Sequence, residues 1–126
     1  MNSAVRVLIA DDDLMIRQVL REVLDEEPDI TVVAVAEDAE EAIRLAERDR
    51  PQVAVLDVRM PGGGGAHAAR GILARSPETA ILAFSAYADR AAMAGLRAVG
   101  VSEYLVKGVP NTVLVEAVRR LGRGPG

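Results

Sequence analysis

The chain has 126 residues, a net charge of −4, no cysteine and a single histidine. These numbers exclude a disulfide framework, a thiolate metal site and a histidine cluster within one chain, so any metal must be held by oxygen atoms. Lysine and arginine form no block, which argues against direct binding of nucleic acid by this chain. The first residues lack the basic start and long apolar segment of a secretory signal, and no apolar run approaches the ~20 residues that span a bilayer. We therefore expect a cytoplasmic protein without membrane contact.

Five short apolar runs, rich in β-branched residues, are predicted to be strands. They cover residues 5–10, 31–36, 53–56, 80–84 and 104–106. Helical patterns separate these runs, and such alternation is typical of an α/β protein with a parallel sheet. Only 2% of the residues are aromatic, so the core must be built from interlocking Val, Leu, Ile and Ala side chains.

The first helix has the clearest pattern. Its apolar positions follow helical spacing at Ile16, Val19, Leu20, Val23 and Leu24. Its solvent side is predicted to carry Arg17, Arg21, Glu22 and Asp25. Asp13 is expected to cap the helix, because acids favour the positive end of the helix dipole. Pro28 lies just beyond the expected end of the helix.

Four further helices are predicted downstream. The second begins at Asp38, whose carboxylate can cap the helix while Glu41 reaches back, and it ends near Pro51. The third follows the glycine run 62–65, the fourth covers about 89–99, and the fifth covers about 110–121. Residues 122–126 show no periodicity, so we expect one domain over 1–121 followed by a flexible tail or the start of a linker.

About five strand–helix units with right-handed crossovers predict a doubly wound parallel sheet with helices on both faces. In such sheets ligands bind beyond the carboxyl ends of the strands, and those ends carry Asp11, Asp12, Asp57, Ser85 and Lys107. In the flavodoxin-like strand order 2-1-3-4-5 the first and third strands are neighbours, which would gather the three acids in one pocket. Such a pocket needs a cation, and Mg²⁺ is the natural candidate because it prefers hard oxygen ligands together with phosphoryl oxygens.

These residues and their order resemble the receiver domains of two-component response regulators, over essentially the whole chain. The matching features are the acidic pair after the first strand, LDVRMPG around Asp57, AFSA around Ser85, and EYLVK ending at Lys107. The resemblance implies that Asp57 accepts a phosphoryl group from a sensor histidine kinase. It also implies that Asp12 and Asp57 bind Mg²⁺ directly, Asp11 through water, and Arg59 through its backbone carbonyl.

The same resemblance implies further roles. Lys107 would neutralise charge on the transferring oxygens, and Ser85 and Tyr104 would form a switch that relays the change to the face of the fourth helix and fifth strand. Arg59 and Tyr87 would modulate the lifetime of the phosphoryl group, for which we expect slow decay. The chain would then catalyse only its own phosphorylation and dephosphorylation. By the same resemblance, three features favour receivers of LuxR/NarL-type transcriptional regulators: the DDxxMIR arrangement at 11–17, the glycine-rich loop and the KGVP segment.

Two departures from the family pattern bear on local geometry. Gly108 follows Lys107 where many relatives have proline in a cis peptide, so the conformation of this loop is left open. The run 62–65 contains four glycines, which lose much backbone entropy on ordering, and this predicts a mobile loop beside Asp57.

Other readings stay open at this point. A phosphatase of the haloacid dehalogenase type also follows a strand with D-x-D, which Asp11 and Asp13 supply, although Met15 stands where that family usually has threonine. A receiver-fold interaction domain without phosphotransfer is a third possibility. His67 is expected to be merely exposed. Kinase choice is expected to rest on the exposed side of the first helix near Met15, Arg17 and Gln18.

The form of the complete protein is also left open by the residues. A homodimer through the first and last helices, or through the fourth helix and fifth strand, is plausible by resemblance. If residues 122–126 are a linker, a DNA-binding domain could follow in a longer parent protein.

Overall fold

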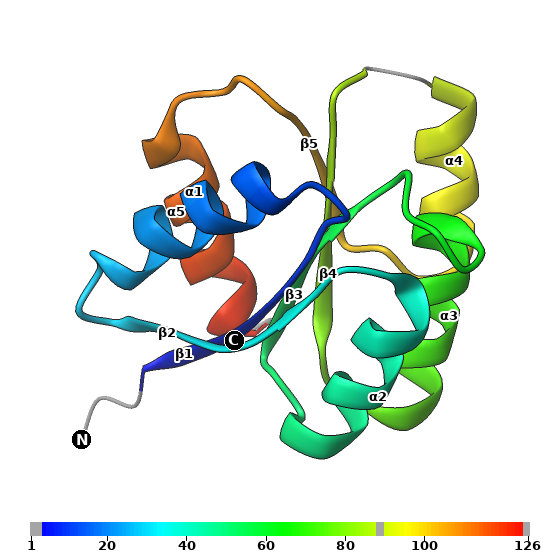
Figure 1. The fold of residues 1–126 in the computed structure, drawn as a ribbon, viewed down its shortest axis with the longest axis horizontal. Helices are drawn as coiled ribbons and strands as arrows, with labels where there is room; N and C mark the ends of the chain where they lie inside the picture. Colours follow the sequence, from blue (N-terminus) through cyan, green and yellow to red (C-terminus); the bar gives the residue numbers. More distant parts are fainter. Residues whose placement is uncertain (1–3, 88–89, 125–126) are drawn as a thin grey trace.

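The computed structural model describes residues 4–87 and 90–124, and within them the chain forms one parallel five-stranded sheet (Figure 1). The strands are β1 Val5–Ala10, β2 Ile30–Ala36, β3 Val53–Asp57, β4 Ala80–Ser85 and β5 Glu103–Val106. Their order is β2-β1-β3-β4-β5, which confirms the flavodoxin-like order predicted above. Because β1 lies between β2 and β3, the ends of β1 and β3 are neighbours, and Ala10 pairs with Leu56.

Five helices cover the two faces of the sheet. They are α1 Leu14–Asp25, α2 Ala39–Asp49, α3 Gly64–Arg75, α4 Arg90–Ala98 and α5 Asn111–Gly122. Helices α1 and α5 lie on one face, and α2, α3 and α4 lie on the other (Figure 1). None of the helices in the described residues is long and apolar enough to cross a membrane.

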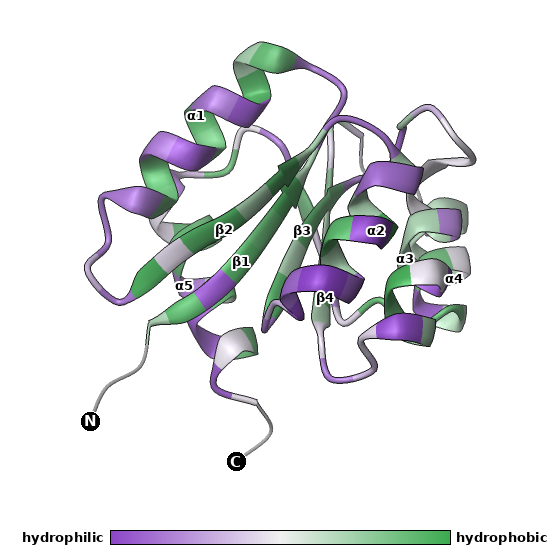
Figure 2. Cartoon of the chain, turned by 60° about the horizontal axis from the view of Figure 1, so that its bottom comes forward, coloured by the Kyte–Doolittle hydropathy of each residue, from purple (hydrophilic) through white to green (hydrophobic). Residues whose placement is uncertain are grey.

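Alternation along the strands feeds a separate core on each face of the sheet. In β1, Val7 and Ile9 pack into the core beneath α1 and α5, whereas Leu8 and Ala10 pack into the core beneath the other three helices. The central strand β3 is buried on both faces, as expected for a parallel sheet, and it lies in the apolar centre in Figure 2. Burial of the strands leaves their carboxyl ends as the place where polar side chains can gather.

The predicted helix starts at Asp13 and Asp38 are present. The Asp13 carboxylate accepts the backbone N–H groups of Met15 and Ile16 at 2.8 and 3.2 Å. The Asp38 carboxylate accepts the N–H of Glu41 at 2.8 Å. The Glu41 side chain reaches back as expected, but to the N–H of Glu37 at 2.8 Å, one residue before Asp38.

Three predicted details differ from the structure. Helix α3 begins at Gly64, so it includes the last two glycines of the run 62–65; the Gly65 N–H donates to the Val58 carbonyl at 2.9 Å, which draws the helix start close to β3. Val19 was expected on the buried side of α1, but it is 51% exposed and lies outside the core. The buried residues of α1 are Leu20 and Leu24. Helix α5 continues to Gly122, where an added Cβ would clash with the Val5 side chain.

The predicted boundaries of α4 and of the tail need a further remark. Helix α4 starts at Arg90 and ends at Ala98, close to the expected range 89–99, of which residue 89 lies outside the described residues. Gly122 belongs to α5 and Arg123 caps it, so the predicted tail starts at residue 124, two residues later than expected. Residues 125 and 126 lie outside the described part of the chain.

Candidate functional site

Three acids meet at the carboxyl ends of β1 and β3. Asp11 and Asp12 follow β1, and Asp57 is the last residue of β3. One carboxylate oxygen from each of the three lies within 4.8 Å of the others. Asp11 is fully buried, Asp57 is 7% exposed, and Asp12 is exposed. The pocket therefore has two acids in its wall and one at its mouth.

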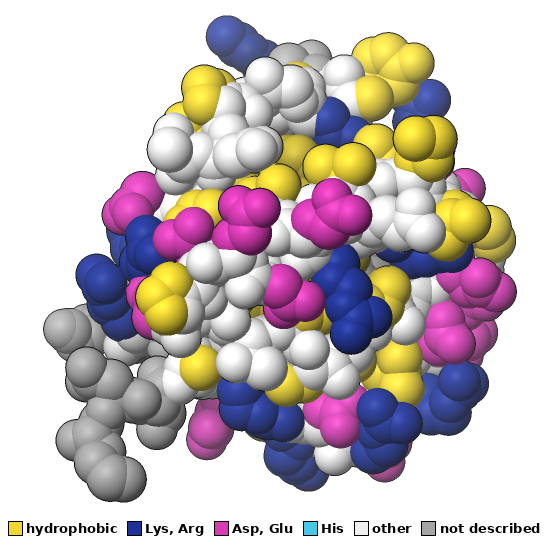
Figure 3. Space-filling view, turned by 60° about the vertical axis from the view of Figure 1, so that its left-hand side comes forward, with side chains coloured by type: hydrophobic (Ala, Val, Ile, Leu, Met, Phe, Trp, Pro, Cys, Tyr) yellow, Lys and Arg dark blue, Asp and Glu magenta, His cyan; other side chains and the backbone are white. Residues whose placement is uncertain are grey.

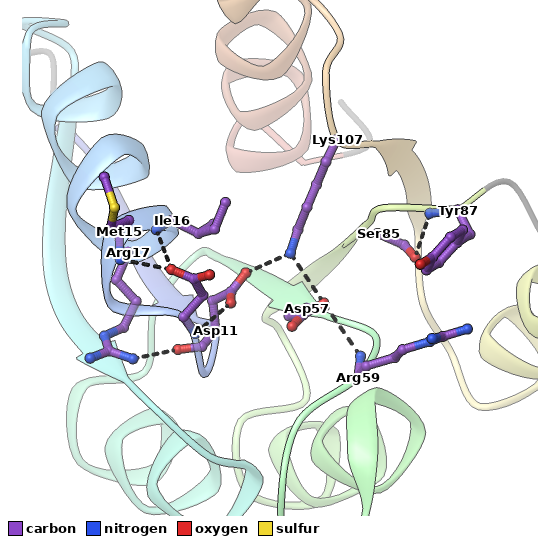
Figure 4. Close-up of polar contacts among 10 residues, drawn as sticks. Asp11, Met15, Ile16, Arg17, Asp57, Arg59, Ser85, Tyr87 and Lys107 are labelled. Atoms are coloured by element: carbon purple, nitrogen blue, oxygen red, sulfur yellow. Dashed lines mark hydrogen bonds and ion pairs between the residues drawn. The ribbon is translucent and has the colours of Figure 1, made fainter.

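Lys107 lies between the two buried acids, as Figure 4 shows. Its Nζ is 2.9 Å from Asp11 Oδ2 and 3.4 Å from Asp57 Oδ1. Lys107 directly follows β5, and its backbone N–H donates to the Ser85 carbonyl at 2.6 Å, which fixes the start of this loop beside the end of β4. Burial works against the charged ammonium, but the hydrogen bond and charge of Asp11, followed by Asp57, outweigh it and raise the pKa of Lys107.

The carboxyl group of Asp57 has a raised pKa. Burial is the first cause and the nearby charge of Asp11 the second, and Lys107 and the N–H of Arg59 oppose them only in part. With all three acids ionised, three negative charges face one ammonium, which leaves two negative charges. An excess of two at a cluster of carboxylate oxygens fits a divalent cation, and oxygen ligands suit Mg²⁺.

Ser85 and the two tyrosines are connected through the backbone of Tyr87. The Tyr87 N–H donates to Ser85 Oγ at 3.2 Å, and the Tyr104 hydroxyl donates to the Tyr87 carbonyl at 2.8 Å. Ser85 is 4% exposed, whereas the Tyr87 side chain is mostly on the surface. A serine hydroxyl has one hydrogen to donate besides its acceptor lone pairs, so accepting from Tyr87 leaves its own O–H free for another oxygen.

Arg59 contacts the site in two ways. Its backbone N–H donates to Asp57 Oδ1 at 3.4 Å, and its guanidinium lies 4.6 Å from the centre of the Tyr87 ring, a cation–π contact. Residues from the ends of β3 and β4 are thus joined beside Asp57 (Figure 4).

Other singled-out residues lie outside the pocket or in unexpected places. The Asp13 carboxylate is used as the cap of α1, and the His67 ring is 2.7 Å from Glu40 Oε1, between α3 and α2. The interpretation of Arg17 as a solvent-facing residue was wrong: its side chain is only 14% exposed, and it donates to the Asp11 carbonyl. Sequence reasoning missed this contact, although a cation in the first turn of a helix, where the dipole favours anions, was a signal.

The loop after Lys107 has a simple geometry. All peptide bonds of the described residues are trans, including the bond to Gly108. Gly108 has a φ of 103°, a conformation that favours glycine and that the proline ring, which holds φ near about −65°, cannot adopt. Glycine at this position is thus compatible with a backbone conformation that proline could not form.

The fold and the pocket together define a class: a doubly wound domain with two acids after β1, an acid at the end of β3, a buried serine at the end of β4 and a lysine after β5. The response regulator receiver domain family matches residues 7–119. The chain therefore belongs to the response regulator receiver domains.

Similar proteins place the chain within this family. The DNA-binding transcriptional activator DevR/DosR of Mycobacterium tuberculosis is 36% identical over 120 residues, which cover 95% of this chain and 55% of that protein. The signal receiver domain of a response regulator described as NarL, from the same organism, has a TM-score of 0.92 at 31% identity and covers 97% of this chain and 98% of that one. A protein-glutamate methylesterase/protein-glutamine glutaminase of Shewanella frigidimarina is 39% identical over 106 residues, 82% of this chain and 26% of that protein. The chain spans about half the length of the transcriptional regulators it matches.

Proposed function

We propose that this domain is a phosphorylation-controlled receiver in which Asp57 is the phosphoacceptor. The observation that carries the proposal is the position of its carboxylate, 3.4 Å from Lys107 Nζ and within 4.8 Å of the other two acids. A lone pair of the Asp57 carboxylate forms a bond to phosphorus while the bond from phosphorus to the donor breaks. The leaving group keeps that electron pair, and an acyl phosphate results.

The other pocket residues support this reaction by holding charge. Asp11, Asp12 and Asp57, with the backbone carbonyl of Arg59, would hold Mg²⁺, which when bound supplies positive charge for the phosphoryl oxygens. Lys107 already touches Asp57 and is positioned to move its ammonium onto a phosphoryl oxygen. These residues act on the domain's own Asp57, so the domain would be a signalling module rather than an enzyme with a separate substrate.

The hydrogen bonds of Tyr87 support a relay from the pocket to the face of α4 and β5. Ser85, with its free O–H, would donate to a phosphoryl oxygen on Asp57. Movement of Ser85 toward Asp57 would strain or break its bond with the Tyr87 N–H, and the Tyr87 carbonyl is in turn held by Tyr104. The phosphoryl group would thereby shift the population of Tyr104 conformers.

A sensor histidine kinase is the proposed phosphodonor, and α1 with the loop before α5 is its proposed contact. Leu14, Met15 and Val19 are 58%, 72% and 51% exposed. Val19 also lines an apolar groove of about 200 Å³ that runs to Lys107 and Val109. Figure 3, which brings this side of the molecule forward, shows hydrophobic side chains exposed among acidic and basic ones. Gln18 is exposed and remains a specificity candidate.

The output is proposed to be transcriptional. This step is supported by the likeness to a DNA-binding transcriptional activator, of which the chain spans 55%. A DNA-binding domain would then follow in a longer parent protein, and a cytoplasmic location would follow from that role.

The proposal is tested by incubating the protein with acetyl phosphate and Mg²⁺ and measuring its intact mass. We expect stoichiometric addition of one phosphoryl group, lost on treatment with base and absent from Asp57→Asn. Asp13→Asn is the matched control, because asparagine caps a helix about as well as aspartate and Asp13 lies outside the pocket.

Each alternative function has its own signature in this experiment. Turnover of many phosphoesters per chain that is lost in Asp13→Asn would support the dehalogenase-type phosphatase. No mass change in any variant would contradict the phosphoacceptor role and support an interaction domain.

The same labelled protein tests the proposed slow decay. The Arg59–Tyr87 contact would impede the approach of a hydrolytic water, so we expect Tyr87→Ala to shorten the lifetime of the phosphoryl group. A lifetime of seconds in the unchanged protein would contradict this protective role and leave the phosphoacceptor assignment intact.

A further inference from the structure

Arg17 is a largely buried cation with an unusual partner. Its side chain is 14% exposed, and its Nη1 donates to the backbone carbonyl of Asp11 at 2.8 Å (Figure 4). Arg17 is the fourth residue of α1, at the end of a first turn where the helix dipole favours anions. Helix α1 alone gives no reason for a cation there, so the contact with Asp11 must offset the cost.

The carbonyl that Arg17 holds belongs to the peptide group between Asp11 and Asp12. Within the described residues Asp12 makes no hydrogen bond or ion pair of its own, so the peptide groups on either side, which set the direction of its Cα–Cβ bond, are the contacts left to orient it. The peptide after Asp12 is tied by the Asp13 N–H, which donates to Asp11 Oδ1 at 2.9 Å. The peptide before Asp12 is tied by Arg17.

We infer that Arg17 is a positioning residue that aims the exposed carboxylate of Asp12 into the metal pocket by holding the peptide that precedes it. The inference rests on the metal site of the proposed function. Removing a group that orients a metal ligand by hydrogen bonding, without binding the metal itself, typically lowers metal affinity by about 10- to 100-fold. Arg17 would act in this way through the backbone, without touching the ion.

The positive charge of Arg17 would change Mg²⁺ affinity in the direction opposite to its positioning role. The sign of the change therefore distinguishes the two effects. Removing a cation from the neighbourhood of an acidic pocket strengthens its attraction for Mg²⁺. Electrostatics alone therefore predicts tighter Mg²⁺ binding by Arg17→Met, whereas positioning predicts weaker binding. A role confined to packing predicts a lower melting temperature with an unchanged dissociation constant.

A second contact of Arg17 must be separated from the first. Its Nη2 is 3.7 Å from Glu37 Oε2, but the Glu37 side chain is 66% exposed, so the pair is weak and screened. Glu37→Gln removes this ion pair and leaves the bond to the Asp11 carbonyl. Arg21→Met is the matched control for losing an arginine from α1, because Arg21 lies one turn later with its side chain 59% exposed.

The experiment measures the Mg²⁺ dissociation constant by titration calorimetry, without a phosphoryl donor, at a temperature where each variant is folded by circular dichroism. We expect Arg17→Met to raise the dissociation constant roughly tenfold or more. Arg21→Met and Glu37→Gln should stay within about twofold of the unchanged protein. Arg17→Lys, which keeps a cationic donor, should recover part of the loss.

The outcomes separate this inference from the proposed function. An unchanged or lower dissociation constant for Arg17→Met would overturn the positioning role while the phosphoacceptor assignment stands. Weaker binding by Arg17→Met in a protein that acetyl phosphate does not label would uphold the positioning role and overturn phosphoryl acceptance. Absence of Mg²⁺ binding by the unchanged protein would overturn both.

Discussion

Asp57 is held in an environment that disfavours its charged form, chiefly through burial and then through Asp11. Because its folded-state pKa lies above the unfolded value, the stability contributed by this group is full below the unfolded pKa and is lost as pH rises through the folded pKa. We therefore expect Asp57→Asn to stabilise the metal-free protein at neutral pH by about 1 kcal/mol, a typical gain when a functional site is relieved. The melting temperature should rise by about 3–6 °C.

The pH dependence identifies the cause of this gain. As pH falls through the raised pKa of the Asp57 carboxyl, this group takes up its proton and the difference between the two proteins should shrink. Glu37→Gln, which removes an exposed carboxylate, should show no comparable gain at neutral pH. Thermal melts from neutral to acidic pH check both points. If the difference in melting temperature between Asp57→Asn and the unchanged protein grew as pH falls, the charge of Asp57 would not be the cause of the gain.

At the scale of the elements, two helical glycines provide a matched pair. Gly95 lies within α4, and an added Cβ would meet no atom within 4 Å. Gly65 lies at the start of α3, where a Cβ would be 3.0 Å from Val58 Cα and 3.2 Å from the Asp57 carbonyl oxygen. We expect Gly95→Ala to stabilise the protein by up to about 1 kcal/mol through helix propensity. Gly65→Ala should lose about 1–3 kcal/mol, because a backbone neighbour cannot yield as a side chain can.

Chemical denaturation of the two variants measures both changes on one scale. Equal stabilisation by the two alanines would show that α3 does not press on the end of β3. Destabilisation confined to Gly65→Ala would instead show that glycine at this position keeps the backbone after Asp57 in place.

The elements also show where prediction from sequence succeeds. Local patterns place Asp11, Asp12 and Asp57 at strand ends, and parallel strands bring those ends to one edge of the sheet. The meeting of the three acids also needed β1 and β3 to be neighbours, which came from the flavodoxin-like strand order and not from local patterns. The contacts of Val19, Arg17 and Gly65 do not follow from such patterns. Each depends on a neighbour distant in the chain or on a turn: the groove beside Lys107, the carbonyl of Asp11 and the backbone after Asp57. Helical periodicity places a residue on a face, but tertiary packing decides whether that face meets solvent.

At the scale of the whole molecule, one sheet separates two cores, so both halves share every strand. A ligand at the strand ends is therefore expected to stabilise the domain as a unit. Mg²⁺ that binds only the folded state should add ~2.7 kcal/mol to the free energy of unfolding at 100 times its dissociation constant. Urea unfolding with and without Mg²⁺, followed by circular dichroism and by tyrosine fluorescence, measures this gain. The two signals should shift together.

Asp12→Asn is the variant that isolates the ion's contribution to the whole domain. Asp12 is exposed and makes no hydrogen bond or ion pair within the described residues, so its replacement should leave metal-free stability within about 0.5 kcal/mol. The same change removes a proposed direct ligand, and most of the gain from Mg²⁺ should disappear. An equal gain in both proteins would place the ion elsewhere on the molecule. A gain seen by tyrosine fluorescence alone would show that the ion orders only the strand ends near Tyr87 and Tyr104 and leaves the rest of the sheet unaffected.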